Sequence, residues 1–172
     1  SYRLGSTVAC GGTAIGIVTL SITDDDVSVT LKKALVPASN SGLFNLSITG
    51  GTPVPDGGTN PANNQGNGGS TGAVKVAPSS VITLAETAGT STLLSDYTTA
   101  LSCVDGDGTS VPITGSGTSR TITTPDLTVS AAARTITCTY TNTALSPVVT
   151  GRVFLDNGAS GGVANDGRPL SR

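Results

Sequence analysis

The sequence predicts an all-β fold, a sandwich or barrel of short strands. Three observations carry this prediction: apolar residues alternate with polar ones in five segments, helical periodicity is nearly missing, and glycine (23) and proline (9) are frequent. Alternation with a period of two indicates strands that bury one face. The abundant Thr and Val favour a pleated backbone, whereas Gly, Asn and Asp favour turns. We therefore expect many short strands joined by loops.

Each of the five predicted strands places alternate residues on one buried face. Three of these faces end on a polar residue, which is unusual for a core position. The residues in the inward phase are, in chain order, Val27, Val29, Leu31 and Lys33; Phe44, Leu46 and Ile48; Ile82, Leu84 and Glu86; Tyr97, Leu101 and Cys103; and Ile136, Cys138, Tyr140 and Asn142.

Two further segments lie between these strands. Residues 50–72 are polar and rich in Gly and Asn, so the composition predicts a long mobile hairpin loop with almost nothing to bury. Its glycines do not open a helix, and a phosphate-binding loop is therefore not expected. Residues 125–134 are interpreted as a strand followed by a turn.

The two ends of the chain have the pattern of pieces of other modules. Residues 18–26 resemble residues 136–144, since both are a strand with a short polar exit. This similarity indicates an internal repeat with a truncated first copy. We expect a closing segment of a preceding repeat or an exchanged strand over 1–26, a sandwich domain over 27–145, and over 146–172 the opening strand and loop of a following module or an exchanged strand.

Composition excludes several classes of function. The net charge is -2 and no basic patch exists, so nucleic acid is not an expected partner. No apolar run approaches the roughly 18 residues of a membrane span, and we expect no membrane insertion. The chain has no His, which excludes a Ser-His-Asp or Cys-His nucleophile and any His metal ligand. No cofactor and no turnover enzyme are expected.

Four stretches carry a resemblance to a known family: VSVTLKKALVPA, VITLAETAG, SDYTTALSCVDGDG and ARTITCTYTNTAL. In this order they resemble the prealbumin-like repeat of large bacterial surface proteins, which is similar to the Cna B-type domains of adhesins and pilins. The final TGRVFLDNGASGGVANDGRPL resembles the opening of a B-type module of serine-aspartate surface proteins. The resemblance implies an immunoglobulin-like β-sandwich with flanking strand segments, located on the bacterial cell surface.

The cysteines raise the question of a disulfide. Cys103 and Cys138 lie on the inward phase of their strands, and the family pattern places these two strands side by side. In an extracellular setting the resemblance therefore implies a Cys103–Cys138 disulfide, the alternative being two buried thiols. Cys10 is left over, as a free thiol or paired with another chain.

Lys33, Glu86 and Asn142 form a second set of candidates. The resemblance implies that the Lys33 amine attacks the Asn142 carboxamide, with Glu86 as proton shuttle, to give an intramolecular isopeptide bond. Burial favours the neutral amine and the protonated acid that this reaction needs. The alternative is three polar residues at strand ends, solvated or salt-bridged. Lys32 is adjacent to Lys33, and a shift of one residue would reverse the buried face.

Acidic residues offer a weak candidate metal site. Asp156, Asn157 and Asp166 lie in a segment that can hold calcium in related modules, and oxygen ligands suit Ca²⁺. Their spacing differs from the EF-hand pattern, so a solvated turn is the competing interpretation.

Together these features predict a structural subunit of an extracellular bacterial fibre or stalk. Its partners would be copies of itself, joined head to tail by strand sharing or tandem linkage. The alternative is a ligand- or carbohydrate-binding adhesin module. Such sites need aromatic platforms, and the chain has few aromatic residues, mostly in inward phase: Tyr2, Tyr97, Tyr140, Phe44 and Phe154.

Overall fold

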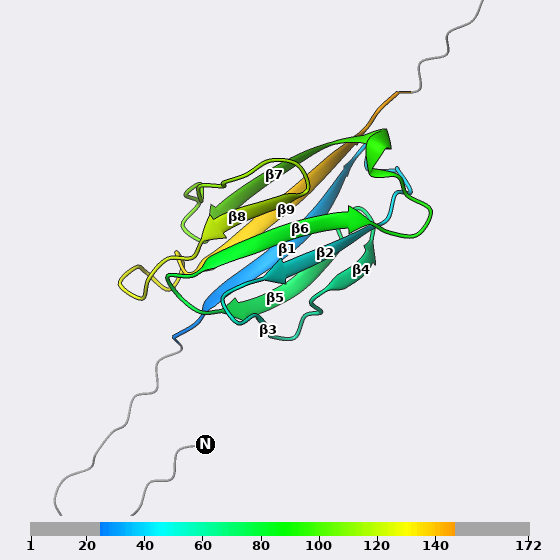
Figure 1. The fold of residues 1–172 in the computed structure, drawn as a ribbon. Helices are drawn as coiled ribbons and strands as arrows, with labels where there is room; N and C mark the ends of the chain where they lie inside the picture. The colour runs from blue at the N-terminus through cyan, green and yellow to red at the C-terminus, as the bar shows by residue number, and fades with distance from the viewer. Residues whose placement is uncertain (1–24, 147–172) are drawn as a thin grey trace, which may run out of the picture.

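The computed structural model describes residues 25–146, which form two β-sheets packed face to face (Figure 1). The predicted all-β sandwich is confirmed. The elements are β1 (Val27–Val36), β2 (Phe44–Thr49), β3 (Val54–Pro55), β4 (Ala62–Gln65), β5 (Ser70–Val76), β6 (Val81–Ala88), a short 3-10 turn η1 (Leu94–Asp96), β7 (Tyr97–Asp105), β8 (Ser119–Thr123) and β9 (Thr135–Ala144).

The first and last strands are neighbours in the larger sheet. That sheet has the order β3-β5-β1-β9-β7, and the smaller sheet has the order β4-β2-β6-β8. β1 and β9 pair in parallel, whereas the other strand pairs are antiparallel. The described chain therefore begins at one end of the sandwich, the N-terminal pole, and leaves at the opposite end, the C-terminal pole (Figure 1).

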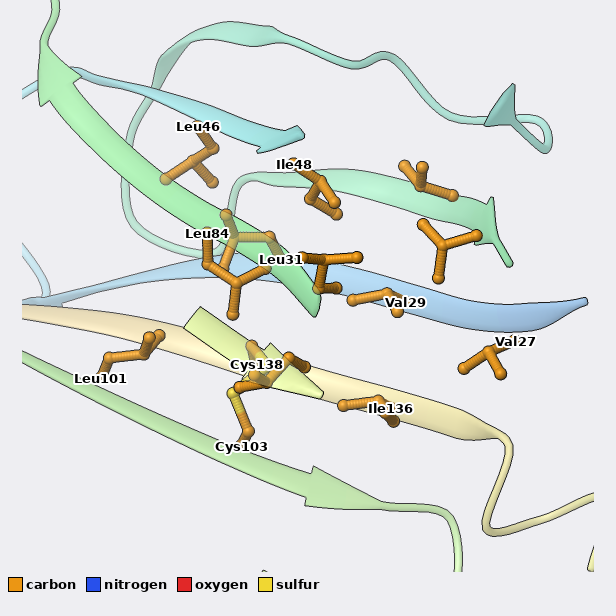
Figure 2. Packing of buried hydrophobic residues seen from close by; sticks show 14 of the residues in the cluster. Val27, Val29, Leu31, Leu46, Ile48, Leu84, Leu101, Cys103, Ile136 and Cys138 are labelled. Carbon is orange, nitrogen blue, oxygen red and sulfur yellow. A yellow bond between two sulfur atoms is a disulfide. The ribbon is translucent and has the colours of Figure 1, made fainter. Parts of the chain in front are cut away.

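The core lies between the two sheets and is built from the inward residues of β1, β2, β5, β6, β7, β8 and β9 (Figure 2). In β1 buried and less buried residues alternate, as the period-two sequence pattern requires. Each fully buried Val, Leu, Ile or Phe contributes about 1.5–3 kcal/mol to folding. The core cluster is Val27, Val29, Leu31, Leu46, Ile48, Val74, Val76, Ile82, Leu84, Leu101, Cys103, Ile122, Ile136, Cys138 and Tyr140.

The expectation of a long mobile loop over residues 50–72 is wrong. This segment contains β3, β4 and the start of β5, and Ala62 within it is buried. The Asn60 side chain acts here like a strand backbone: its Oδ1 accepts from the Ile48 N–H at 2.9 Å and its Nδ2 donates to the Ile48 carbonyl at 2.8 Å. Composition did not predict this ordered structure because it depends on backbone pairing with β2 and β5 and on polar side chains, rather than on a run of buried apolar residues.

The strand expected within residues 125–134 is also absent, because this segment consists of turns. The Asp126 carboxylate accepts from the Thr128 N–H at 2.9 Å and closes one turn. Leu127 and Val129 remain exposed, so no sheet covers their side chains.

Within residues 25–146 no helix is long and apolar enough to span a membrane. The proposed repeat copy over 1–26 and the module opening over 146–172 lie almost entirely outside the described residues.

Candidate functional site

Lys33, Glu86 and Asn142 meet in the interior near the C-terminal pole. They come from β1, β6 and β9, and their exposed fractions are 2%, 1% and 0%. The Lys33 ammonium donates to Glu86 Oε2 at 2.6 Å, and Asn142 Nδ2 donates to Glu86 Oε1 at 2.7 Å. The carboxylate of Glu86 thus bridges the amine and the carboxamide.

Strand register explains this meeting. In the parallel pair β1–β9, Lys33 is opposite Tyr140, so Asn142 lies two residues further along on the same inward face. Glu86 projects from the facing sheet, where Leu46 is its neighbour on β2. Lys32 is exposed, which places Lys33 and not Lys32 in the core.

Burial and charge act in opposite directions on the Lys33 amine. Desolvation is the larger influence and holds the pKa of Lys33 below its ordinary value, while the hydrogen bond and charge of Glu86 raise it. The amine also lies 4.2 Å from the centre of the Phe44 ring. A buried ion pair of this kind gains little net stability, because both charges have lost their water.

Asn142 Oδ1 is buried without a hydrogen-bond partner. A buried acceptor left in this way costs about 1–3 kcal/mol. If the carboxamide turned over, Oδ1 would face Glu86, and a protonated Glu86 would then donate to it. Transfer of one proton from the Lys33 ammonium to the Glu86 carboxylate would give a neutral amine and a carboxylic acid beside the carboxamide, which are the reactants of an amide exchange with loss of ammonia.

Tyr140 connects the two sheets beside this site. Its hydroxyl lies 2.8 Å from the Leu84 carbonyl and 3.1 Å from the Thr118 carbonyl, which also accepts from the Glu86 N–H at 2.8 Å. Burial, followed by the negative charge of Glu86, raises the pKa of Tyr140 to about 12. Sequence patterning assigned Tyr140 and Phe44 to the core but did not predict that they contact the polar cluster.

A disulfide joins Cys103 and Cys138 across the neighbouring strands β7 and β9 (Figure 2). The two cysteines are directly opposite each other in the antiparallel register, and both are buried. Cys10 lies outside the described residues.

The calcium candidates Asp156, Asn157 and Asp166 also lie outside the described residues. Within residues 25–146 no group of three or more His, Cys, Asp or Glu side chains could hold a metal ion. Asp105 closes a turn instead, because its carboxylate accepts from the N–H groups of Asp107 and Thr109 at 3.0 and 2.8 Å.

Comparison with known proteins gives one family match. A family model described as a prealbumin-like fold domain matches residues 28–144. A search of curated proteins gave no match. Among solved structures, the major pilin from Streptococcus pyogenes is similar at 16% identity with a TM-score of 0.31. Two mutants of that pilin give 16% and 17% identity with TM-scores of 0.36 and 0.34. Each match covers 70% of this chain and 48% of the pilin, so the chain spans about half the pilin's length.

Proposed function

Because the chain belongs to the family of prealbumin-like fold domains, we propose that it is a structural subunit of an extracellular bacterial fibre or surface stalk. We further propose that a Lys33–Asn142 isopeptide bond reinforces it. The observation that carries the proposal is the buried Lys33–Glu86–Asn142 cluster, which bridges the first and last strands of the sandwich. The buried disulfide is in keeping with an oxidising compartment outside the cytosol.

The proposed reaction happens once per molecule. The Lys33 ammonium gives a proton to the Glu86 carboxylate, and the neutral Nζ attacks Cγ of Asn142. The protonated Glu86 donates its proton to Nδ2 of Asn142 and accepts a proton from Nζ of Lys33. The Cγ–Nδ2 bond then breaks, and ammonia leaves. The products are a Lys–Asn amide, ammonia and Glu86 as a carboxylic acid that can donate to Oδ1. This is self-modification rather than turnover.

Intact mass tests the cross-link directly. The native chain is expected to weigh about 17 Da less than its sequence, the mass of the ammonia lost when an amine displaces a carboxamide nitrogen. Glu86→Ala is expected to restore the full mass, because it removes the proton shuttle and leaves both reacting groups in place. The disulfide is reduced before the measurement, so that the small mass change it causes is not mistaken for part of the loss of ammonia. An unmodified native mass would refute the bond and leave the fold assignment intact.

Assembly is the second part of the proposal. The chain enters and leaves the sandwich at opposite poles, and this arrangement suits a linear series of copies (Figure 1). β7 lies at an edge of its sheet. Residues 109–111 already cover its C-terminal part, since the Val111 N–H donates to the Cys103 carbonyl at 2.9 Å. The part of the edge from Tyr97 to Leu101 is where a strand from another chain could add. A head-to-tail contact of this kind does not close, so it gives an open filament.

Removal of residues 1–22 is expected to shorten or abolish filaments, if that segment supplies the shared strand. Sedimentation velocity and electron microscopy of the full and truncated chains measure the effect. Filaments of undiminished length from the truncated chain would show that this segment is not the joint.

The adhesin alternative finds no support among the described residues. Phe44 and Tyr140 are buried, and Tyr97 is half-buried against Phe44 with ring centroids 5.2 Å apart. Residues 25–146 therefore present no exposed aromatic platform for a sugar.

A further inference from the structure

The partner of β1 becomes irregular just before Lys33. Thr30 is paired with Ala73 on β5, and Lys32 is paired with Ser70, with a shift of register between them. Two β5 residues therefore lie opposite the single residue Leu31, which is a β-bulge. Bulges of this kind occur next to reactive sites, where they change the direction of a side chain.

From the bulge onward, three alternate N–H groups of β1 donate to acceptors in the segment 67–71. The central one is bound by a backbone carbonyl, and the two outer ones are bound by side-chain oxygens. The hydrogen bonds are Leu31 N to Thr71 Oγ1 (3.1 Å), Lys33 N to Gly69 O (2.8 Å), Leu35 N to Asn67 Oδ1 (2.9 Å) and, in return, Gly68 N to Lys33 O (2.9 Å).

Thr71 faces the core because of the residue that follows it. Gly72 has φ of 65°, and a Cβ at this position would lie 2.8 Å from the Cα of Gly58. Only glycine fits there without strain. The resulting turn buries Thr71, whose hydroxyl donates to the Gly72 carbonyl at 2.9 Å while it accepts from β1.

We propose that Asn67 and Thr71 are positioning residues for the Lys33–Asn142 cross-link, an inference that rests on the proposed function. Neither touches the reacting atoms. They hold β1 from one edge, on either side of Lys33, while the other edge pairs with β9, which carries Asn142. Their side chains thus fix how far the amine lies from the carboxamide. Reaction rates are sensitive to such placement, since an error of about 1 Å can cost about a hundredfold.

The test measures the rate of cross-linking in the full chain after a short pulse of cell-free synthesis. Trypsin resistance selects the folded molecules, and intact mass gives their cross-linked fraction over time.

Thr71→Val keeps the shape of the side chain but removes the acceptor, and Asn67→Ala removes the other acceptor. Each is expected to slow cross-linking of folded molecules roughly tenfold. Thr71→Ser and Asn67→Asp keep an acceptor oxygen and are expected to restore the rate. Asn63→Ala, at an exposed position of β4, is the matched control and is expected to react like the native chain.

Three outcomes would overturn the inference. Folded Thr71→Val and Asn67→Ala chains that cross-link at the native rate would refute the positioning role only. The isopeptide bond itself would still be supported by the mass deficit of the native chain. A loss of trypsin resistance in step with the loss of cross-linking, unrescued by Thr71→Ser or Asn67→Asp, would assign these residues to folding only. A native chain whose mass is not about 17 Da (one ammonia) below its sequence mass would refute the inference together with the cross-link on which it rests.

Discussion

Replacement of Asn142 by alanine is expected to lower the free energy of unfolding by about 5 kcal/mol. A Lys33–Asn142 bond closes a loop of roughly 100 residues. In the chain-entropy model, a cross-link of that span lowers the conformational entropy of the unfolded state and so stabilises the fold by about 5 kcal/mol. The loss in Asn142→Ala would appear in chemical denaturation as a lower midpoint. Asn63→Ala, at an exposed position, is the matched control and is expected to change stability by less than about 0.5 kcal/mol.

A double-mutant cycle separates the covalent bond from ordinary contacts. Without a bond, Lys33→Ala and Asn142→Ala would act on groups that both contact Glu86, and their coupling would be about 0.5–3 kcal/mol. With a bond, either single replacement already removes the whole cross-link. The coupling energy should then approach about 5 kcal/mol, the stabilisation that the chain-entropy model assigns to a closed loop of this length. Near-additive losses would argue against a covalent link.

Loss of the Cys103–Cys138 disulfide is expected to cost about 3–4 kcal/mol, since its two cysteines are 35 positions apart in the chain. The double variant Cys103→Ala, Cys138→Ala measures this loss by denaturation. Both cysteines are buried. Dithiothreitol is therefore expected to reduce the native protein only when denaturant is also present.

Non-reducing peptide mapping checks the pairing itself. The peptides that contain Cys103 and Cys138 should be recovered linked. Alkylation of both thiols in unreduced protein would contradict the bond. The two single alanine variants provide a further control, because each should destabilise nearly as much as the double variant if the disulfide is the main loss.

Five strands, β1, β2, β6, β7 and β9, could be predicted from sequence because their alternation is strict, whereas β3, β4, β5 and β8 could not. The inward phases from Val27 to Lys33 and from Ile136 to Asn142 hold in the structure, and the same phase resolves the ambiguity between Lys32 and Lys33. The alternation of buried and exposed residues is a local property of each strand, so it can be recognised in the sequence without knowledge of the partner strands.

Other features depended on contacts between distant segments and were not predictable in this way. Residues 50–72 are ordered by strand pairing with β2 and β5, together with the Asn60 side chain, which binds the Ile48 backbone. The bulge opposite Leu31 depends on Thr71 and Gly72, which composition had marked as part of a loop. The Lys33 amine contacts the Phe44 ring because the two sheets pack face to face, and it contacts the Tyr140 carbonyl because β1 pairs with β9; no local pattern encodes either relation.

The parallel pairing of β1 and β9 determines how the domain would respond to tension. A force applied through the two ends of the described chain pulls β1 and β9 in opposite directions along their shared ladder, so all its hydrogen bonds are loaded in shear rather than opened one after another. With the Lys33–Asn142 bond in place, the load would pass from β1 into β9 through a covalent amide. The sequence between those two residues, including both sheets' remaining strands, would then carry no tension, and the domain would behave as a nearly inextensible link.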